Sequence, residues 1–151
     1  MPWIIIVFVI LILDILSKWL VIQKIDLFNT VTVINHFFYL THIRNTGAAW
    51  NIFQDNTLFL AFFSFIIISI IIFFILKNKQ VGVRLPLTFI LGGALGNFCD
   101  RVFRGSVVDF IQLHFGNYIF PTFNIADSFI CIGVILMLIN IIFQKKEVES
   151  G

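Results

Sequence analysis

The sequence predicts an all-α integral membrane protein, with four transmembrane helices and a small extracytoplasmic β-cradle and loop. Composition is the first observation: 60% of the 151 residues are hydrophobic and 12% are charged, whereas about a quarter of the residues in a soluble domain are charged. The second is a set of four apolar runs, each close to the roughly 20 residues that cross a bilayer; they lie at about 3–22, 58–76, 85–102 and 123–143. The third is a pair of more polar segments, at about 23–56 and 103–121. We therefore expect residues 1–151 to form a single membrane domain.

Charge and cysteine usage exclude several classes of function. The formal net charge of +2 is too small to indicate a nucleic-acid partner. Cys99 and Cys131 both lie in predicted spans, and the sequence has no C-x-x-C pair and no H-E-x-x-H motif. A thiol-based metal site and a zinc protease find no support. We expect no metal or cofactor, and we interpret the two cysteines as buried structural thiols.

The first apolar run begins near the start of the chain, but it lacks a basic leading segment and a small-x-small cleavage site. It is long enough to span, so we expect a retained helix rather than a secretory signal. Asp14 and Lys18 stand four residues apart in it and share one helix face. One interpretation is a neutralising ion pair, with Lys18 extending to the membrane interface. The other is a role in a functional site. The two roles are compatible.

The polar segment at 23–56 includes TVTVINHFFYLTHI, which alternates imperfectly and is rich in β-branched and aromatic residues. We expect two short strands outside the membrane, joined by a turn near Asn35. The next stretch, Asn45 to Trp50, has small residues followed by an aromatic one. It suits a loop that returns to the interface, where Trp anchors well. Residue type alone favours a turn role for Asn45 over a ligand contact.

The second span carries no charge, and a short basic connector leads from it to the third. In the third span Pro86 suits the first helical turn, and Gly92 and Gly96 form a G-x-x-x-G pair that lets helices approach closely in lipid. Three polar residues follow on one face if the helix continues; these are Asn97, Asp100 and Arg101. Asp100 and Arg101, taken alone, suit a structural clamp at the end of the helix.

The segment 103–121 is expected to be a loop, and it holds Asp109 between bulky apolar residues in VVDF. Such a carboxylate is unusual in a solvated loop, which indicates a re-entrant or interfacial segment. The last span opens with Asn124 and Asp127 on one helix face. Asn124 suits an N-cap, a role that leaves Asp127 unexplained. At 1.5 Å per residue, Asp127 lies roughly 6 Å, about one turn, below the start of this helix.

Four spans place both ends of the chain and the 76–85 connector on one side of the membrane. The distribution of Lys and Arg favours that side as the cytoplasmic one. The segment 23–56 then faces the outer side, together with three carboxylates, those of Asp100, Asp109 and Asp127.

Polar groups in or beside a membrane span are costly and mark functional sites. Two neighbouring carboxylates in a poorly hydrated place share a proton, so one serves as a general base toward water while the other polarises a carbonyl. Asp109 and Asp127 would supply such an aspartic dyad for peptide hydrolysis if they meet, which spacing alone leaves open. A proton or ion pathway is the competing use of intramembrane aspartates.

Other nucleophiles are weaker candidates. Ser17 and Lys18 are adjacent and point to different helix faces, which disfavours a Ser–Lys dyad. Cys99 would need His114 as its base, but it lies in an apolar helix with no fixed basic partner.

Five motifs occur in the order DILSK (14–18), RNTGAAW (44–50), GGALGNFCDR (92–101), VVDF (107–110) and FNIADS (123–128). With these motifs the chain resembles, over nearly its whole length, the lipoprotein signal peptidases (signal peptidase II) of bacteria. Ile15 stands where that family often has Gln, and Trp50 stands where it often has Phe. Neither is a residue that we expect to be catalytic.

The resemblance implies four transmembrane helices with cytoplasmic termini in the bacterial cytoplasmic (inner) membrane, and a small extracytoplasmic β-cradle from the 23–56 region. It implies a membrane aspartic endopeptidase without a cofactor. The substrate would be a diacylglyceryl-modified prolipoprotein, cleaved just before the lipidated lipobox Cys to release the signal peptide. Membrane lipid and globomycin-like inhibitors are further partners that the resemblance implies.

The family's dyad maps onto Asp109 and Asp127. Asp100 is a rival for the first position, but Arg101 beside it is expected to hold it ionised, which suits proton sharing poorly. The residues that the resemblance implies would line or brace the site are Asp14, Lys18, Asn45, Gly93, Asn97, Asp100, Arg101, Asn124 and Ala126.

Two other classes of function stay open at the level of the residues. A small proton-coupled transporter or channel would need a continuous polar path, and the second span offers only Ser64 and Ser69. A non-catalytic scaffold that uses Asp–Arg pairs for assembly would leave Asp109 and Asp127 unexplained.

Overall fold

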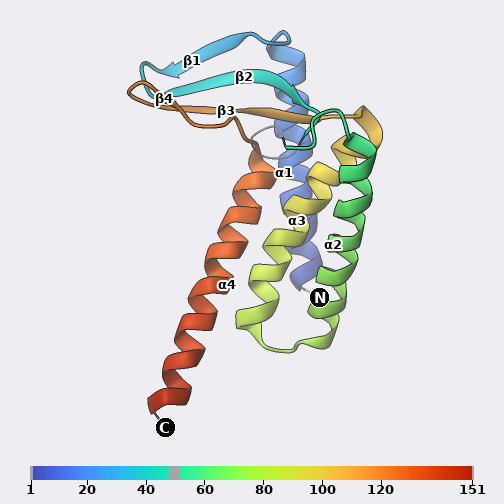
Figure 1. Cartoon of the computed structure of the whole chain (residues 1–151), viewed down its shortest axis with the longest axis vertical. Helices are drawn as coiled ribbons and strands as arrows, with labels where there is room; N and C mark the ends of the chain where they lie inside the picture. The colour runs from blue at the N-terminus through green and yellow to red at the C-terminus, as the bar shows by residue number, and fades with distance from the viewer. Residues whose placement is uncertain (1, 48–51, 151) are drawn as a thin grey trace.

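The computed structural model describes residues 2–47 and 52–150 of the chain. Its helices are α1 (Pro2–Lys24), α2 (Thr57–Lys77), α3 (Val81–Arg104) and α4 (Ile125–Ser150). Its strands are β1 (Thr30–Ile34), β2 (Phe38–Asn45), β3 (Val107–Phe115) and β4 (Tyr118–Ile119). Figure 1 shows the sheet lying across one end of the helical bundle, with both ends of the chain directed away from it. In the described residues, each helix contains a segment long and apolar enough to cross a membrane.

The structure contains the four long apolar helices that the sequence predicted, and two of their boundaries differ. The third helix begins at Val81, so Pro86 is its sixth residue and not part of the first turn. The fourth helix begins at Ile125 because the residue before its cap, Phe123, pairs with Ile111 in an isolated bridge to the sheet. Trp50, expected to anchor a loop at the interface, lies outside the described residues.

The strands form one antiparallel sheet of order β1-β2-β3-β4, and the turn predicted near Asn35 joins β1 to β2. The prediction of a loop at 103–121 is wrong, because β3 pairs with β2 from Phe38↔Leu113 to Asn45↔Val107. The physical reason is that backbone N–H and C=O groups that lose access to water need partners. Strand β2 supplies these partners between Val107 and Leu113.

Helix α3 packs against the other three helices, and small residues permit the close approach. A Cβ atom on Gly92 would press against Ile10 of α1, and one on Gly96 would collide with the Asp14 carboxylate of the same helix. On another side, a Cβ atom on Gly93 would collide with the carbonyl oxygen of Ala126 in α4. The glycines therefore bring polar groups of α1 and α4 directly against α3, as the G-x-x-x-G pair predicted.

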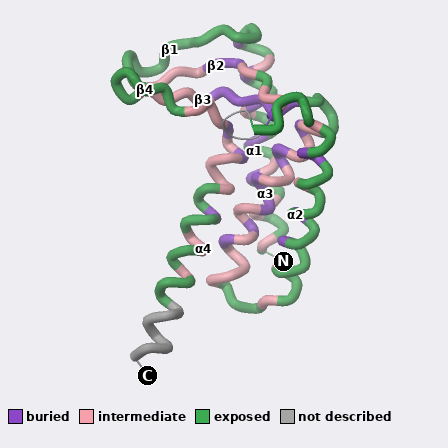
Figure 2. The backbone as a smooth tube through the Cα atoms, viewed as in Figure 1, coloured by how far each residue is buried: buried purple, intermediate pink, exposed green. Residues whose placement is uncertain are grey.

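Burial is uneven along the bundle. Outward-facing Ile, Leu and Phe side chains of α1, α2 and α4 are exposed, as lipid-facing surfaces are. Figure 2 shows buried positions concentrated where α3 meets the sheet end of the molecule. The buried polar residues include Asp14, Lys18, Asn97, Asp100, Asp109 and Asn124, so the polar side chains that the sequence singled out gather in this region.

Candidate active site

A cavity of about 830 Å³ opens between the sheet and the adjoining ends of α3 and α4. Its polar lining includes Asn45, Asn97, Arg101, Asp109 and Asp127. Its apolar lining includes Leu113, Phe115, Phe120, Phe123 and Ile130. One wall can therefore carry out proton chemistry while the other accepts apolar groups.

Asp109 lies in β3 opposite Ile43 of β2, next to an irregularity in register between Leu40 and Ile43. Irregularities of this kind redirect side chains beside active sites. The carboxyl group is 3% exposed, and its two oxygens accept hydrogen bonds from Asn45 Nδ2 (2.9 Å) and Asn124 Nδ2 (2.7 Å).

Burial, and after it the negative charge of Asp127, raise the pKa of the Asp109 carboxyl to about 7. The hydrogen bonds from Asn45 and Asn124 oppose the rise because they favour the ionised form. Near neutral pH, Asp109 is therefore able to hold or release a proton.

Asp127 is the third residue of α4 and forms a reciprocal cap with Asn124. The Asp127 amide donates to Asn124 Oδ1 (2.9 Å), and the Asn124 amide donates to Asp127 Oδ2 (3.2 Å). This is the pairing of a capping box, so the expectation that an N-cap leaves Asp127 unexplained was wrong. The second oxygen, Oδ1, accepts from Asn97 Nδ2 at 2.7 Å.

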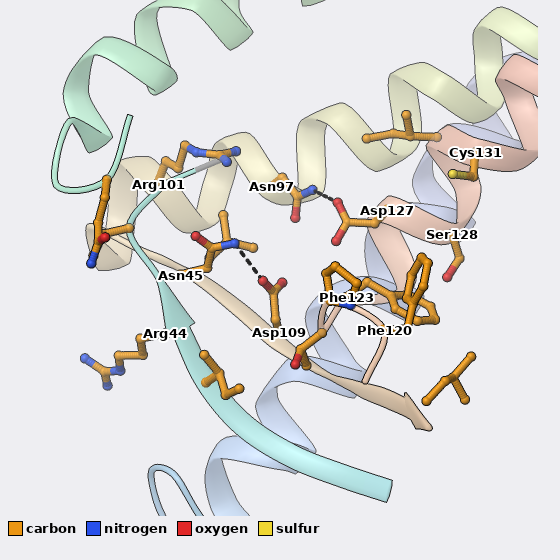
Figure 3. Close-up of a pocket in the computed structure, with 18 of the residues that line it drawn as sticks. Arg44, Asn45, Asn97, Arg101, Asp109, Phe120, Phe123, Asp127, Ser128 and Cys131 are labelled. Carbon is orange, nitrogen blue, oxygen red and sulfur yellow. Dashed lines mark hydrogen bonds between the residues drawn. The ribbon is translucent and has the colours of Figure 1, made fainter. Parts of the chain in front are cut away.

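Asn124 links the two aspartates. Its side chain is fully buried, and besides capping the helix of Asp127 it donates through Nδ2 to Asp109 Oδ1. Figure 3 shows the two carboxyl groups directed toward the same space. The structure thus brings together two residues that the sequence could not show to be neighbours.

Asn45 has the turn role expected for it and also contacts Asp109. Its Oδ1 accepts the Gly47 amide (2.9 Å), which is the local bond of a turn residue, and its Nδ2 donates to Asp109. The turn role expected from residue type is therefore confirmed, and the contact with Asp109 adds a role that residue type did not indicate.

Lys18 and Asp14 form the expected ion pair, with Nζ 2.7 Å from Asp14 Oδ2. The predicted extension of Lys18 to the interface is wrong: the side chain is fully buried and also reaches Asp100 Oδ2 (3.0 Å). Lysine stays inside because Asp14 and Asp100 stabilise its charge there. We call Asp14, Lys18, Asp100 and Arg104 the Lys18 cluster.

The expected clamp between Asp100 and Arg101 is also wrong. Asp100 pairs with Arg104, one turn along the same helix face, and with Lys18. Adjacent residues of a helix point about 100° apart, which turns Arg101 away to the cavity. There it donates to the carbonyl oxygen of Gly47 at 3.2 Å, and its buried Nε has no hydrogen-bond partner among the described residues.

The supporting residues predicted from the sequence therefore divide into two groups. Asn45, Asn97 and Arg101 line the cavity with the two aspartates. The others lie behind its wall, in contacts that hold the helices and the sheet together; they are Asp14, Lys18, Gly93, Asp100, Asn124 and Ala126.

Sequence reasoning missed several lining residues, including Ser128 and Cys131. Cys131 stands four residues after Asp127 in α4, so helical periodicity from that aspartate would have found it. The interpretation of both cysteines as buried is wrong, since Cys131 is exposed and Cys99 only partly buried. Among the described residues, no group of three or more His, Cys, Asp or Glu is arranged to hold a metal ion.

Comparisons with known proteins identify the family of the chain. A family model described as Signal peptidase (SPase) II matches residues 6–143 of the chain. The Lipoprotein signal peptidase of Bacillus pumilus (strain SAFR-032) is 45% identical, over 97% of this chain and 96% of its own length.

Solved structures show the same fold. A bacterial membrane enzyme determined by the in meso method at 2.3 Å resolution superposes with a TM-score of 0.90 at 36% identity, covering 97% of this chain and 90% of that one. Another, determined by the same method at 1.9 Å resolution, gives 0.84 at 37% identity, covering 93% and 92%. Motifs, fold and family match agree, and the chain belongs to the signal peptidase II family.

Proposed function

We propose that this chain is a lipoprotein signal peptidase that acts as an aspartic endopeptidase, with Asp109 and Asp127 as its catalytic dyad. The observation that carries the proposal is the coupled carboxyl pair. Asp109 is buried on the cavity wall, its pKa is raised by burial and by the charge of Asp127, and one asparagine contacts both residues. Such a pair retains one proton near neutral pH.

The raised pKa assigns the proton to Asp109 at the start of the reaction. Asp127 then takes a proton from water, and the water oxygen bonds to the scissile carbonyl carbon while Asp109 gives its proton to the carbonyl oxygen. The resulting diol collapses: the C–N bond breaks, the amine nitrogen takes the proton from Asp127, and a diol proton returns to Asp109. The dyad ends in its initial state, and one water has been added across the bond.

Three cavity residues would orient the reacting groups. Asn45 and Asn97 hold one oxygen of each aspartate through their amide nitrogens, which leaves the carboxyl groups little rotational freedom. Arg101, which also lines the cavity, would place its guanidinium group beside a substrate carbonyl. Fixed donors of this kind stabilise charge that develops in the transition state.

The substrate in this proposal is a prolipoprotein whose lipobox Cys carries diacylglycerol, with cleavage just before that residue. The name of the Bacillus pumilus relative supports a lipoprotein substrate. The apolar cavity wall supports a place for lipid or for apolar signal-peptide side chains. Membrane lipid and inhibitors of the globomycin type, which would mimic the substrate, are the other proposed partners.

We propose the bacterial inner membrane as the location, with the sheet and the cavity on the extracytoplasmic side. Lys77, Lys79 and Arg84 lie at the α2–α3 connection, which Figure 1 shows at the opposite end of the bundle from the sheet. Basic residues of short loops favour the cytoplasmic side. A lipidated Cys anchored in the outer leaflet would then present its scissile bond at the level of the dyad.

The test is cleavage of a diacylglyceryl-modified lipobox peptide by the purified protein, beside Asp109→Asn and Asp127→Asn. We expect cleavage before the lipidated Cys, lost in both variants although both insert and fold. Asp26→Asn, which changes an exposed aspartate outside the cavity, is the matched control and should keep full activity. A folded wild-type protein without cleavage, or full activity in either dyad variant, would refute the proposal.

A further inference from the structure

Lys18 is the centre of a buried polar arrangement that lies behind the cavity wall. Its ammonium group is fully buried and has three oxygen contacts, one for each of its donors. They are to Asp14 Oδ2 (2.7 Å), Asp100 Oδ2 (3.0 Å) and Asn97 Oδ1 (3.0 Å). The three acceptors lie on α1 and α3, so one side chain joins both helices.

The two carboxylates that Lys18 contacts have a property in common. Asp14 Oδ1 accepts the backbone amide of Ala126 at 2.9 Å, and Ala126 directly precedes Asp127. Asp100 Oδ2 accepts the backbone amide of Val108 at 3.2 Å, and Val108 directly precedes Asp109. Each carboxylate thus anchors the backbone immediately before one member of the dyad.

The third contact sets the orientation of an amide. An ammonium group only donates hydrogen bonds, so the oxygen of Asn97 has to face Lys18. The nitrogen of the same amide then faces Asp127 and donates to its Oδ1. Without Lys18, the amide would lose one of the two donors that hold its oxygen; the other is Asn124 Nδ2 at 3.2 Å.

We propose that Lys18 is a positioning residue that fixes the separation and orientation of Asp109 and Asp127 through Asp14, Asp100 and Asn97. The inference rests on the proposed aspartic dyad and deepens it. One ammonium group is tied to the backbone before each aspartate and to an amide that holds Asp127 directly. A displacement at Lys18 is therefore transmitted to both reacting carboxyl groups.

Stability alone accounts poorly for this arrangement. Charged groups in a membrane span are expensive, and apolar replacements of buried ion pairs are often neutral or stabilising. Packing of α1 against α3 is already provided at Gly92, where Ile10 fits closely. Apolar side chains, however, could not accept hydrogen bonds from the Ala126 and Val108 amides, and they could not fix the orientation of Asn97.

The test compares Lys18→Met with the double variant Lys18→Met/Asp14→Asn in the lipopeptide assay. Methionine keeps the length of the side chain and removes its three donors. In the double variant, asparagine removes the uncompensated charge while its Oδ1 still accepts the Ala126 amide. Ser17→Ala is the matched control, because Ser17 lies beside Lys18 and, within the described part of the chain, its hydroxyl bonds only to the backbone carbonyl of Asp14.

We expect kcat to fall on the order of 100-fold in both Lys18 variants, since displacements of about 1 Å have effects of this size. KM should change little, because Lys18 does not line the cavity. The alkaline limb of the pH–rate profile should move to higher pH, because Lys18 lowers the pKa of Asp109, against the effect of Asp127. Arg101, the other cation facing this carboxyl group, is unchanged in every variant.

A folded double variant with wild-type kcat and an unmoved pH profile would overturn the inference, because Lys18 would then only balance charge. The parallel dyad variants separate this failure from failure of the proposed function. If the wild-type protein cleaves and Asp109→Asn and Asp127→Asn are inactive, the dyad stands whatever the Lys18 variants do. If either dyad variant is active, the positioning inference falls with the dyad.

Discussion

The Lys18 cluster and the cavity pair, Asp109 and Asp127, place carboxylates in different electrostatic surroundings. In the cluster, two cations face two anions, and each carboxylate contacts an ammonium or guanidinium group. In the cavity pair, the carboxylates accept hydrogen bonds from amides and face each other's charge, and Lys18 and Arg101 act on them without forming an ion pair among the described residues. Asp100 is 2% exposed and Asp109 is 3% exposed, so burial does not distinguish them. The charge of the partner decides which carboxylate can share a proton.

The largest effect expected from this comparison is on turnover. Asp109→Asn and Asp127→Asn should each lower kcat on the order of 10⁴-fold, as loss of an essential catalytic group does.

Asp100→Asn should lower turnover less completely, because it leaves the dyad intact, but it should destabilise the fold by about 3–5 kcal/mol through the loss of a buried ionic partner. Lipopeptide cleavage and thermal unfolding in detergent measure the two effects. Complete loss in Asp100→Asn with activity retained in Asp109→Asn would exchange the two roles.

The next effect concerns stability and pH. The pKa of Asp109 is raised from 3.8 to about 7 in the folded protein. Well below pH 3.8 the group is protonated in both the folded and the unfolded state and has no effect on stability. As pH rises toward 7, the unfolded chain ionises first, so folding loses stability, by roughly 4 kcal/mol at 1.36 kcal/mol per pKa unit.

The Asp109→Asn variant does not lose folding stability in this way as the pH rises, because asparagine does not ionise. Its thermal stability relative to wild type should therefore rise between pH 4 and pH 8, and the matched Asp26→Asn control should show no such trend. Any loss of hydrogen bonds to Asn45 or Asn124 is independent of pH and does not obscure the trend. A constant difference across this range would contradict the raised pKa.

The smallest effect concerns the donors of the cavity pair. Asn45→Ala removes a hydrogen bond that lowers the pKa of Asp109, so the alkaline limb of the pH–rate profile should move to higher pH. Turnover at the optimum should fall about tenfold, in keeping with the roughly 1.5–3 kcal/mol of a hydrogen bond to a charged group. Asn29→Ala, at an exposed asparagine before β1, is the control. A limb that moves to lower pH would contradict the account.

Much of the fold was predictable because long apolar runs and their connectors are local features. The spans at α1 and α2 were placed within a few residues, and the hairpin with its turn near Asn35 was found from β-branched alternation. Strand β3 was missed because its partner, β2, lies about seventy positions earlier in the chain. Pairing over such a distance leaves no signal in the segment itself.

The site was predictable as a set of residues but not as a set of contacts. Asp100 was assigned to Arg101, its neighbour in sequence, although spacing of four residues on a helix favours Arg104. The buried position of Lys18 was missed because two of the acceptors that keep it inside, Asp100 and Asn97, lie on another helix. The sequence of the first helix alone does not show them. That Asp109 and Asp127 meet depends on Asn124 and on the hydrogen bonds between β3 and Phe123, just before α4, both of which are tertiary.

The most direct test of the central claim is the protonation of Asp109 itself, followed by carbon-13 NMR of labelled aspartate in the wild-type protein and in Asp127→Asn. The account predicts that Asp109 titrates near pH 7 in the wild type and at lower pH in the variant, because the charge of Asp127 has been removed. Titration near pH 4, or an unchanged titration in the variant, would show that the two carboxyl groups are not coupled and would contradict the dyad.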